Sequence, residues 1–352
     1  MSRAPTGEGL PESDALAGVP HPRLAHALVG HARAEAALLE SFKSCRLAHA
    51  WLIGGPRGIG KATLAWRFAR FVLARPDPAS AAVQAARDLS IPPEHPAARQ
   101  VAALAHPDLA LLRPQKLGSK ILVDDVRAAL KLFQMMPGFG GWRVCIIDAA
   151  DDLNASSANA LLKAIEEPPA RSLFLIVAHR PGGVLPTIRS RSRTLLLKAL
   201  DAPDVAKIIP GLGEPWSEFA VDDVASAARR ARGSVQEAIV RLDPDSGPAL
   251  AQIEAVLESL PDFDWSEAHR VAGLVNRKAG AANFKALTTA IFDWMEARLI
   301  AHAGDAPGRL APIAEAWEKI SAATRDTEDY NLDKRLYVLT TFAELAAAAR
   351  RL

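Results

Sequence analysis

The chain has 352 residues, of which 49% are hydrophobic and 23% are charged. At about 150 residues per domain, this length predicts two or three domains and excludes a peptide or a small disulfide-framed protein. The 42 lysines and arginines against 40 aspartates and glutamates give a net charge of +2 and a pI near 8.6, a balance that does not indicate nucleic-acid binding by itself.

The N-terminal segment 1–20 is rich in Gly, Pro, Ser and acidic residues and has no signal-peptide pattern. We expect a disordered leader there, in a cytoplasmic protein without a membrane partner, since no apolar run approaches the roughly 18 residues of a membrane span. The two cysteines, Cys45 and Cys145, lie too far apart for a clustered zinc site or a disulfide framework, which indicates a reducing compartment.

From residue 21 to 200, short apolar runs alternate with helical patterns, which predicts an α/β domain with a parallel sheet and helices on both faces. Helices are predicted at 61–73 and at 124–134, the second capped by Asp124. The segment 75–107 has weak periodicity and predicts a surface insertion rather than part of the sheet. The predicted strands are 49–53, 109–112, 143–147, 172–178 and 194–197.

After residue 200 the sequence predicts helices only. The segment 201–243 is interpreted as a small helical lid, followed by a break at 243–248 and an all-α domain over 248–352. Its final helix is predicted to be capped by Asn331. Two apolar stripes are assigned to assembly with other subunits, with an internal core as the alternative: Phe284, Leu287, Ile291 and Trp294; and Leu332, Leu336 and Leu339, which share one predicted helix face with Phe342.

The strand ending at Ile53 runs into G-G-P-R-G-I-G-K-A-T over residues 54–63, with a helical pattern after it. This predicts a phosphate-binding loop, in which glycines turn backbone N–H groups inward and a lysine neutralises the phosphates. The predicted nucleotide-binding residues are Gly55, Gly58, Gly60, Lys61, Ala62 and Thr63. Ala62 stands where a hydroxyl should bind Mg²⁺, and Thr63 is rotated by about 100° around the helix, so the loop is degenerate.

The apolar strand 143–147 ends in Asp148, the predicted Walker B acid, with Asp151 a turn later. ATP-hydrolysing proteins of this kind place a glutamate after that acid to orient the attacking water, but Ala149 is found here. A general base is worth about 10²- to 10⁴-fold in rate. We therefore expect no efficient hydrolysis, unless Asp151 or Asp152 replaces the missing base.

The segment 189–193 reads R-S-R-S-R. An arginine at a domain edge can enter a neighbouring subunit's ATP site and stabilise the transferring phosphoryl group, an effect of about 10³- to 10⁵-fold. Such a run is also found on ordinary solvated surfaces, and the pattern alone does not decide between the two.

Together these features resemble the delta prime family of AAA+ clamp-loader subunits in bacterial DNA replication, over most of the chain from residue 21. The most specific stretches are D-A-A-D-D-L-N at 148–154 and N-A-L-L-K-A-I-E-E-P-P at 159–169. H-P-D at 106–108 and S-R-S at 190–192 resemble two further family segments, although the family's second motif reads S-R-C.

The resemblance implies an AAA+ domain with a lid and a C-terminal collar domain that forms a hetero-oligomer. It assigns the arginine finger to Arg191 and places Gln236 where ATPase subunits carry a sensor arginine. It implies no zinc, since 75–107 lacks the family's zinc-binding cysteines, and at most weak binding of ATP or ADP. The implied partners are the tau/gamma and delta subunits and, through the complex, the sliding clamp and primer-template DNA.

Three interpretations of function remain after the sequence. The first is a non-hydrolysing subunit of the polymerase holoenzyme that scaffolds the loader and donates Arg191. The second is an active AAA+ ATPase, such as a tau/gamma-type or branch-migration motor, against which Ala62 and Ala149 argue. The third is a nucleotide sensor that binds ATP without hydrolysing it. Lys163 and Arg171 are candidates for DNA phosphate contacts, with a solvated surface as the alternative.

Overall fold

The structure is a computed structural model that describes residues 16, 18–116, 119–135, 138, 141–244, 246–275, 280–304 and 307–352. The chain divides into two compact units, 1–238 and 239–352. Residues 1–15 and 17 of the predicted leader lie outside the described residues, so the leader stays a prediction.

A five-stranded, all-parallel sheet in the order β2-β3-β4-β1-β5 forms the centre of the first unit. Its strands confirm the predicted ones to within one residue at each end. They are β1 (Ala50–Gly54), β2 (Leu109–Leu112), β3 (Arg143–Asp148), β4 (Ser172–Ala178) and β5 (Arg193–Leu196).

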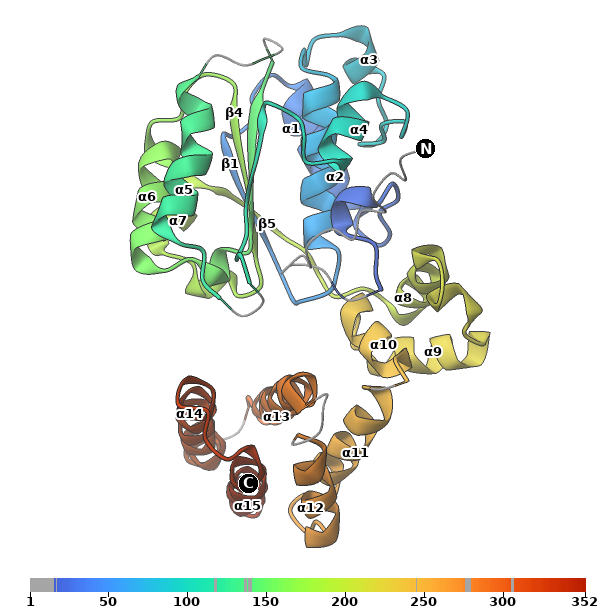
Figure 1. Cartoon of the computed structure of the whole chain (residues 1–352), viewed down its shortest axis with the longest axis vertical. Helices are drawn as coiled ribbons and strands as arrows, with labels where there is room; N and C mark the ends of the chain where they lie inside the picture. The colour runs from blue at the N-terminus through green and yellow to red at the C-terminus, as the bar shows by residue number, and fades with distance from the viewer. Residues whose placement is uncertain are drawn as a thin grey trace, which may run out of the picture. The chain divides into compact units, whose positions relative to one another are not determined.

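Helices cover both faces of this sheet, as the sequence predicted (Figure 1). One face carries α1 (Ala32–Lys43), α2 (Lys61–Ala74), α3 (Ala81–Gln84) and α4 (Pro96–Ala102). The other carries α5 (Val123–Leu130), α6 (Ala155–Glu166) and α7 (Pro186–Arg191).

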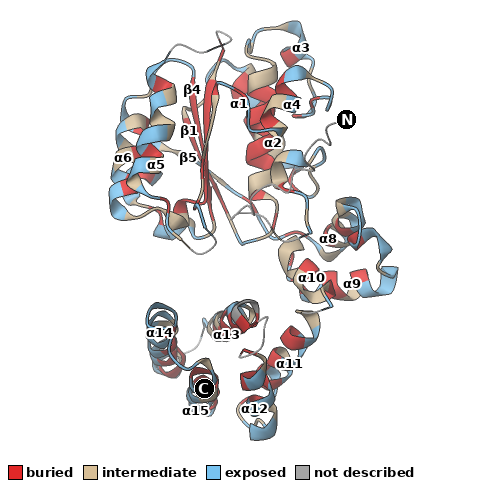
Figure 2. Cartoon of the chain, viewed as in Figure 1, coloured by how far each residue is buried: buried red, intermediate tan, exposed pale blue. Residues whose placement is uncertain are grey.

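The central strands are buried along their whole length and divide their side chains between two cores (Figure 2). In β1, Trp51 and Ile53 pack against α1 and α2, whereas Ala50 and Leu52 pack toward the opposite helices. This alternation follows from the period of two in a strand, and burial of both faces explains why the strands read as continuous apolar runs.

Two local predictions in this unit differ from the structure. Asp124 does not cap its helix: α5 begins after Leu122, whose backbone N–H donates to the Asp125 carboxylate at 3.3 Å, and a 3₁₀ turn, Lys131–Gln134, continues it. The segment 75–107 contributes no strand to the sheet, as predicted, but it is not confined to the surface, because it forms α3 and α4 and places Val83, Leu89 and Val101 in the core against α2.

The lid prediction falls on α8 (Ala202–Ile208), α9 (Val221–Arg230) and α10 (Val235–Leu242), with two 3₁₀ turns between α8 and α9, Ile209–Leu212 and Trp216–Glu218. The division between the compact units lies inside α10, after Ala238. The domain boundaries taken from the sequence, and the names lid and collar, stay predictions.

The second unit contains α11 (Gly247–Glu258), α12 (Trp265–Leu274), α13 (Gly280–Ala301), α14 (Pro307–Asp329) and α15 (Lys334–Ala349). Its core takes in Phe284, Leu287, Ile291 and Trp294, so the first apolar stripe assigned to assembly is instead internal packing. Among the helices that the structure describes, none is long and apolar enough to cross a membrane.

The final helix also differs from its prediction. Its N-cap is Asp333, whose carboxylate accepts from the backbone N–H of Arg335 at 2.8 Å, whereas Asn331 has a positive φ of 49°. The predicted single face is split: Phe342 is fully buried, but Leu332 and Leu336 are exposed.

Candidate nucleotide site and arginine cluster

The predicted phosphate loop lies between β1 and α2. Gly58 has a φ of 71°, and its carbonyl accepts a hydrogen bond from the backbone N–H of Val235 at 2.8 Å. A Cβ at Gly58 would lie 2.3 Å from Ser234 Oγ and 2.5 Å from Gln236 Cβ. Only glycine fits here, because the beginning of α10 packs directly on the loop.

The two ends of the loop are also held by neighbouring segments. A Cβ at Gly55 would lie 2.5 Å from the carbonyl oxygen of Leu197, just past β5, and Gly60 is the N-cap of α2. The ring nitrogen Nε2 of His31 lies 2.6 Å from the Ile59 carbonyl oxygen. The loop is thus fixed by contacts from three other parts of the same unit.

Lys61 is 3% exposed and points back into its own loop. Its Nζ donates to the carbonyl oxygens of Gly55, at 2.7 Å, and Pro56. Burial lowers the pKa of Lys61 to about 8, against the opposing effect of the Asp148 and Asp151 carboxylates. A phosphate that bound here would have to replace the loop carbonyls as the partner of this ammonium.

The residues after Lys61 provide little for a metal ion. Ala62 is half-buried and packs against the core on the α2 side of the sheet, and the half-buried Thr63 follows it in α2. A bound Mg²⁺ takes oxygen ligands, and Ala62 has none at the first position of the helix after the lysine. The loop therefore fits a phosphate group better than it fits the metal ion that accompanies ATP.

Asp148 is the last residue of β3 and is buried, and Ala149 after it is 2% exposed. Asp151 lies in a 3₁₀ turn, Ala150–Asp152. Its carboxylate accepts from the backbone N–H groups of His179 at 2.6 Å and Arg180 at 2.9 Å. Because both oxygens of Asp151 are engaged with the end of β4, this carboxylate is poorly suited to replace the missing catalytic base.

His179 belongs to this group of residues but was not singled out in the sequence. It follows β4, which lies between β1 and β3. Burial, and then the Lys61 and Arg57 charges, lower the pKa of His179 to about 3, although Asp151 opposes them. Its Nδ1 is buried without a hydrogen-bond partner among the described residues. The signal for it was a polar residue directly after an apolar strand of a parallel sheet.

The three arginines near α7 lie in different surroundings, although all three are exposed. Arg189 Nη1 donates to the carbonyl oxygen of Gly182 at 3.4 Å, and the Arg193 guanidinium lies 4.9 Å from the Trp51 ring. Arg191 ends α7, with its Nη2 3.0 Å from Glu166 Oε1. The two candidates for DNA contacts, Lys163 and Arg171, are also exposed.

Residues 30–201 match the family model described as DNA polymerase III, delta subunit. The chain is 37% identical over 144 residues to DNA polymerase III subunit delta' of Pseudomonas aeruginosa, a match that covers 41% of each chain. It is 27% identical over 285 residues to DNA polymerase III subunit delta' of Escherichia coli, a match that covers 79% of each chain. In sequence the chain is similar to the delta' subunits of DNA polymerase III. It is also 30% identical over 220 residues to DNA polymerase III subunit tau/gamma of Haemophilus influenzae, 61% of this chain and 30% of that one.

This similarity agrees with the resemblance carried by the motifs at 148–154 and 159–169. The match to the Pseudomonas relative spans 41% of that relative's length. In the part of the chain that the structure describes, no group of three or more His, Cys, Asp or Glu side chains could hold a metal ion.

Proposed function

We propose that this chain is a cytoplasmic, non-hydrolysing subunit of a bacterial DNA polymerase III clamp loader. It scaffolds the complex and supplies Arg191 to the ATP site of a neighbouring subunit. The assembled loader then opens a sliding clamp and places it on primer-template DNA. The partners are tau/gamma and delta subunits, and the tau/gamma and delta' relatives support this choice.

One observation carries the proposal. The chain has the glycines and the lysine of a phosphate loop between β1 and α2, while Ala62 and Ala149 occupy the positions of the metal-binding hydroxyl and the catalytic glutamate. Lys61 is held by loop carbonyls and Asp151 by backbone N–H groups, so both of these charged side chains already have partners within the chain. Loss of the base and of the metal ligand are independent, and together they argue against the active ATPase.

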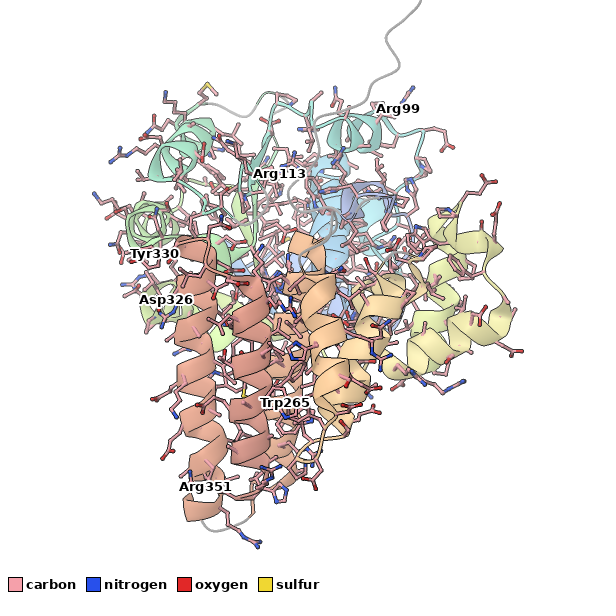
Figure 3. All side chains as sticks on the ribbon, turned by 60° about the horizontal axis from the view of Figure 1, so that its bottom comes forward. Arg99, Arg113, Trp265, Asp326, Tyr330 and Arg351 are labelled. Carbon is pink, nitrogen blue, oxygen red and sulfur yellow. The ribbon has the colours of Figure 1, made fainter. Side chains whose placement is uncertain are left out.

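The C-terminal unit is proposed to carry assembly as a collar. Its buried stripe is needed for its own core, so the interface must use exposed residues. Tyr330, Leu332 and Leu336 are large apolar side chains at the α14–α15 connection, with exposed fractions of 73%, 50% and 62%. Figure 3 shows Tyr330 at the opposite end of this helix pair from Arg351. An exposed apolar patch of this kind is typical of an interaction surface.

The experiment is clamp loading by a complex reconstituted from this chain and its own organism's tau/gamma and delta subunits. Arg191→Ala should leave the chain folded and the complex assembled, because an exposed side chain contributes little to stability. Loading onto primed DNA should fall about tenfold or more, given the usual effect of an arginine finger.

Arg189→Ala and Arg193→Ala are the controls, since a basic patch would respond about equally to the loss of any of the three arginines. Unchanged loading with Arg191→Ala, or equal losses with all three variants, would show that Arg191 is not an arginine finger.

A further inference from the structure

Glu166 and Arg191 form an ion pair between two helix ends. Nη2 of Arg191 lies 3.0 Å from Oε1 of Glu166, and the two side chains are 41% and 38% exposed. Glu166 is the last residue of α6, and Arg191 is the last residue of α7.

Both helix ends are fixed to the sheet by buried neighbours. Ile165, directly before Glu166, is fully buried, and Ile188 in α7 is 1% exposed; both belong to the same core. The two helix ends that carry the pair are therefore anchored in one core, and the ion pair itself lies at the surface.

The guanidinium has further acceptors on its own helix. Its Nη1 donates to the Thr187 carbonyl oxygen at 3.2 Å and to Ser190 Oγ at 3.4 Å. With Glu166 at Nη2, both Nη atoms are held. An arginine has five N–H donors, so N–H groups remain to contact a phosphate without breaking these interactions.

The carboxylate has no evident role in its own helix. Negative charge is unfavourable at a helix C-terminus, where the backbone carbonyls already concentrate partial negative charge, whereas the positive charge of Arg191 suits the end of α7. The contact that compensates Glu166 is the one with Arg191.

We propose that Glu166 is a positioning residue that holds the Arg191 guanidinium in the orientation in which it enters the neighbouring ATP site. This inference rests on the proposed function. Because the finger acts in the transition state, loss of its orientation lowers kcat of the complex and leaves KM for ATP unchanged.

The test is the DNA- and clamp-stimulated ATPase of the reconstituted complex, with kcat and KM measured separately. Glu166→Ala should lower the kcat of the affected site about two- to fivefold, the range expected from a partly exposed ion pair. Glu166→Gln should retain most of the rate, because its amide oxygen still accepts from Nη2. Glu167→Ala is the matched control: the same charge, one residue later and also exposed, with no effect expected.

The double variant Glu166→Ala/Arg191→Ala should be no slower than Arg191→Ala alone, because the carboxylate acts only through the arginine. A normal rate for Glu166→Ala, together with a slow Arg191→Ala, would overturn the positioning role and leave the finger intact. Additive losses in the double variant would also overturn it. A normal rate for Arg191→Ala would overturn the proposed function, and the positioning role with it.

Discussion

The phosphate loop and the end of α7 each present a cation of the kind that phosphate groups bind, but in opposite surroundings. Lys61 is buried and donates to carbonyl oxygens of its own loop. Arg191 is exposed at a helix end, and its contacts with Glu166, Thr187 and Ser190 use three of its five N–H donors. Under the proposed function, the loop is kept as a structural element, and the chemical contribution of the chain comes from Arg191 at the end of α7.

The largest effect that would sharpen this comparison is on the stability of the loop. Gly58→Ala should lower the free energy of unfolding by about 2 to 4 kcal/mol, because a positive φ is strained for alanine and the new Cβ meets Ser234 and Gln236. Urea unfolding of the whole chain measures it. Gly18→Ala is the control: its φ of 71° equals that of Gly58, but nothing lies within 4 Å of the added Cβ.

A loss with Gly58→Ala no larger than that with Gly18→Ala would mean that α10 does not hold the loop. The loop would then be free to rearrange around a nucleotide, and Lys61 would no longer differ from Arg191 in its availability to a phosphate group.

The pH dependence of stability tests how far His179 is buried beside the loop. Its pKa is about 3 in the folded chain against 6.5 as its ordinary value. The unfolded chain therefore binds a proton first as the pH falls, and the free energy of unfolding decreases through the window from 6.5 to 3. His179→Gln should remove up to about 2 kcal/mol of the loss between pH 7 and pH 5.

Denaturant unfolding at the two pH values measures this difference, with the exposed His269→Gln as the control. An equal loss of stability in His179→Gln and the unaltered chain would show that His179 is hydrated.

The smallest effect on folding is expected at the exposed patch of the second unit. Leu332→Ser/Leu336→Ser should change the free energy of unfolding by less than about 0.5 kcal/mol but should weaken co-elution with tau/gamma. Ile291→Ala, in the buried stripe, should instead cost about 2 to 5 kcal/mol. Undiminished co-elution of the double variant would place the interface elsewhere.

Much of the first unit could be predicted because its information is local. Buried parallel strands appear in the sequence as apolar runs. The glycine-rich motif at 54–61 predicts a strand before it and a helix after it, as the structure shows. The assignment of 75–107 failed because short helices that pack by a few residues, such as Val83 and Val101, leave weak periodicity. Asp124 failed as a cap because a neighbouring acid, Asp125, holds the backbone of Leu122 instead.

The site was predicted only in part, because no local stretch of sequence determines the order of the strands in the sheet. The position of β4 between β1 and β3 brings His179 to the phosphate loop, and this order could not be derived from periodicity. The pairing of Glu166 with Arg191 likewise depends on two helices meeting on the same face of the sheet. Helical spacing placed Leu336 on an apolar face of its helix but could not predict whether this side chain would be buried.

The most direct measurement compares two loaders that differ only in this chain, one containing Lys61→Ala and the other Arg191→Ala. If the chain supplies a finger and does not hydrolyse ATP, the Lys61→Ala loader should place clamps on primed DNA at a rate close to that of the unaltered loader. The Arg191→Ala loader should be slower by about tenfold or more. A large loss with Lys61→Ala and a normal rate with Arg191→Ala would contradict the account.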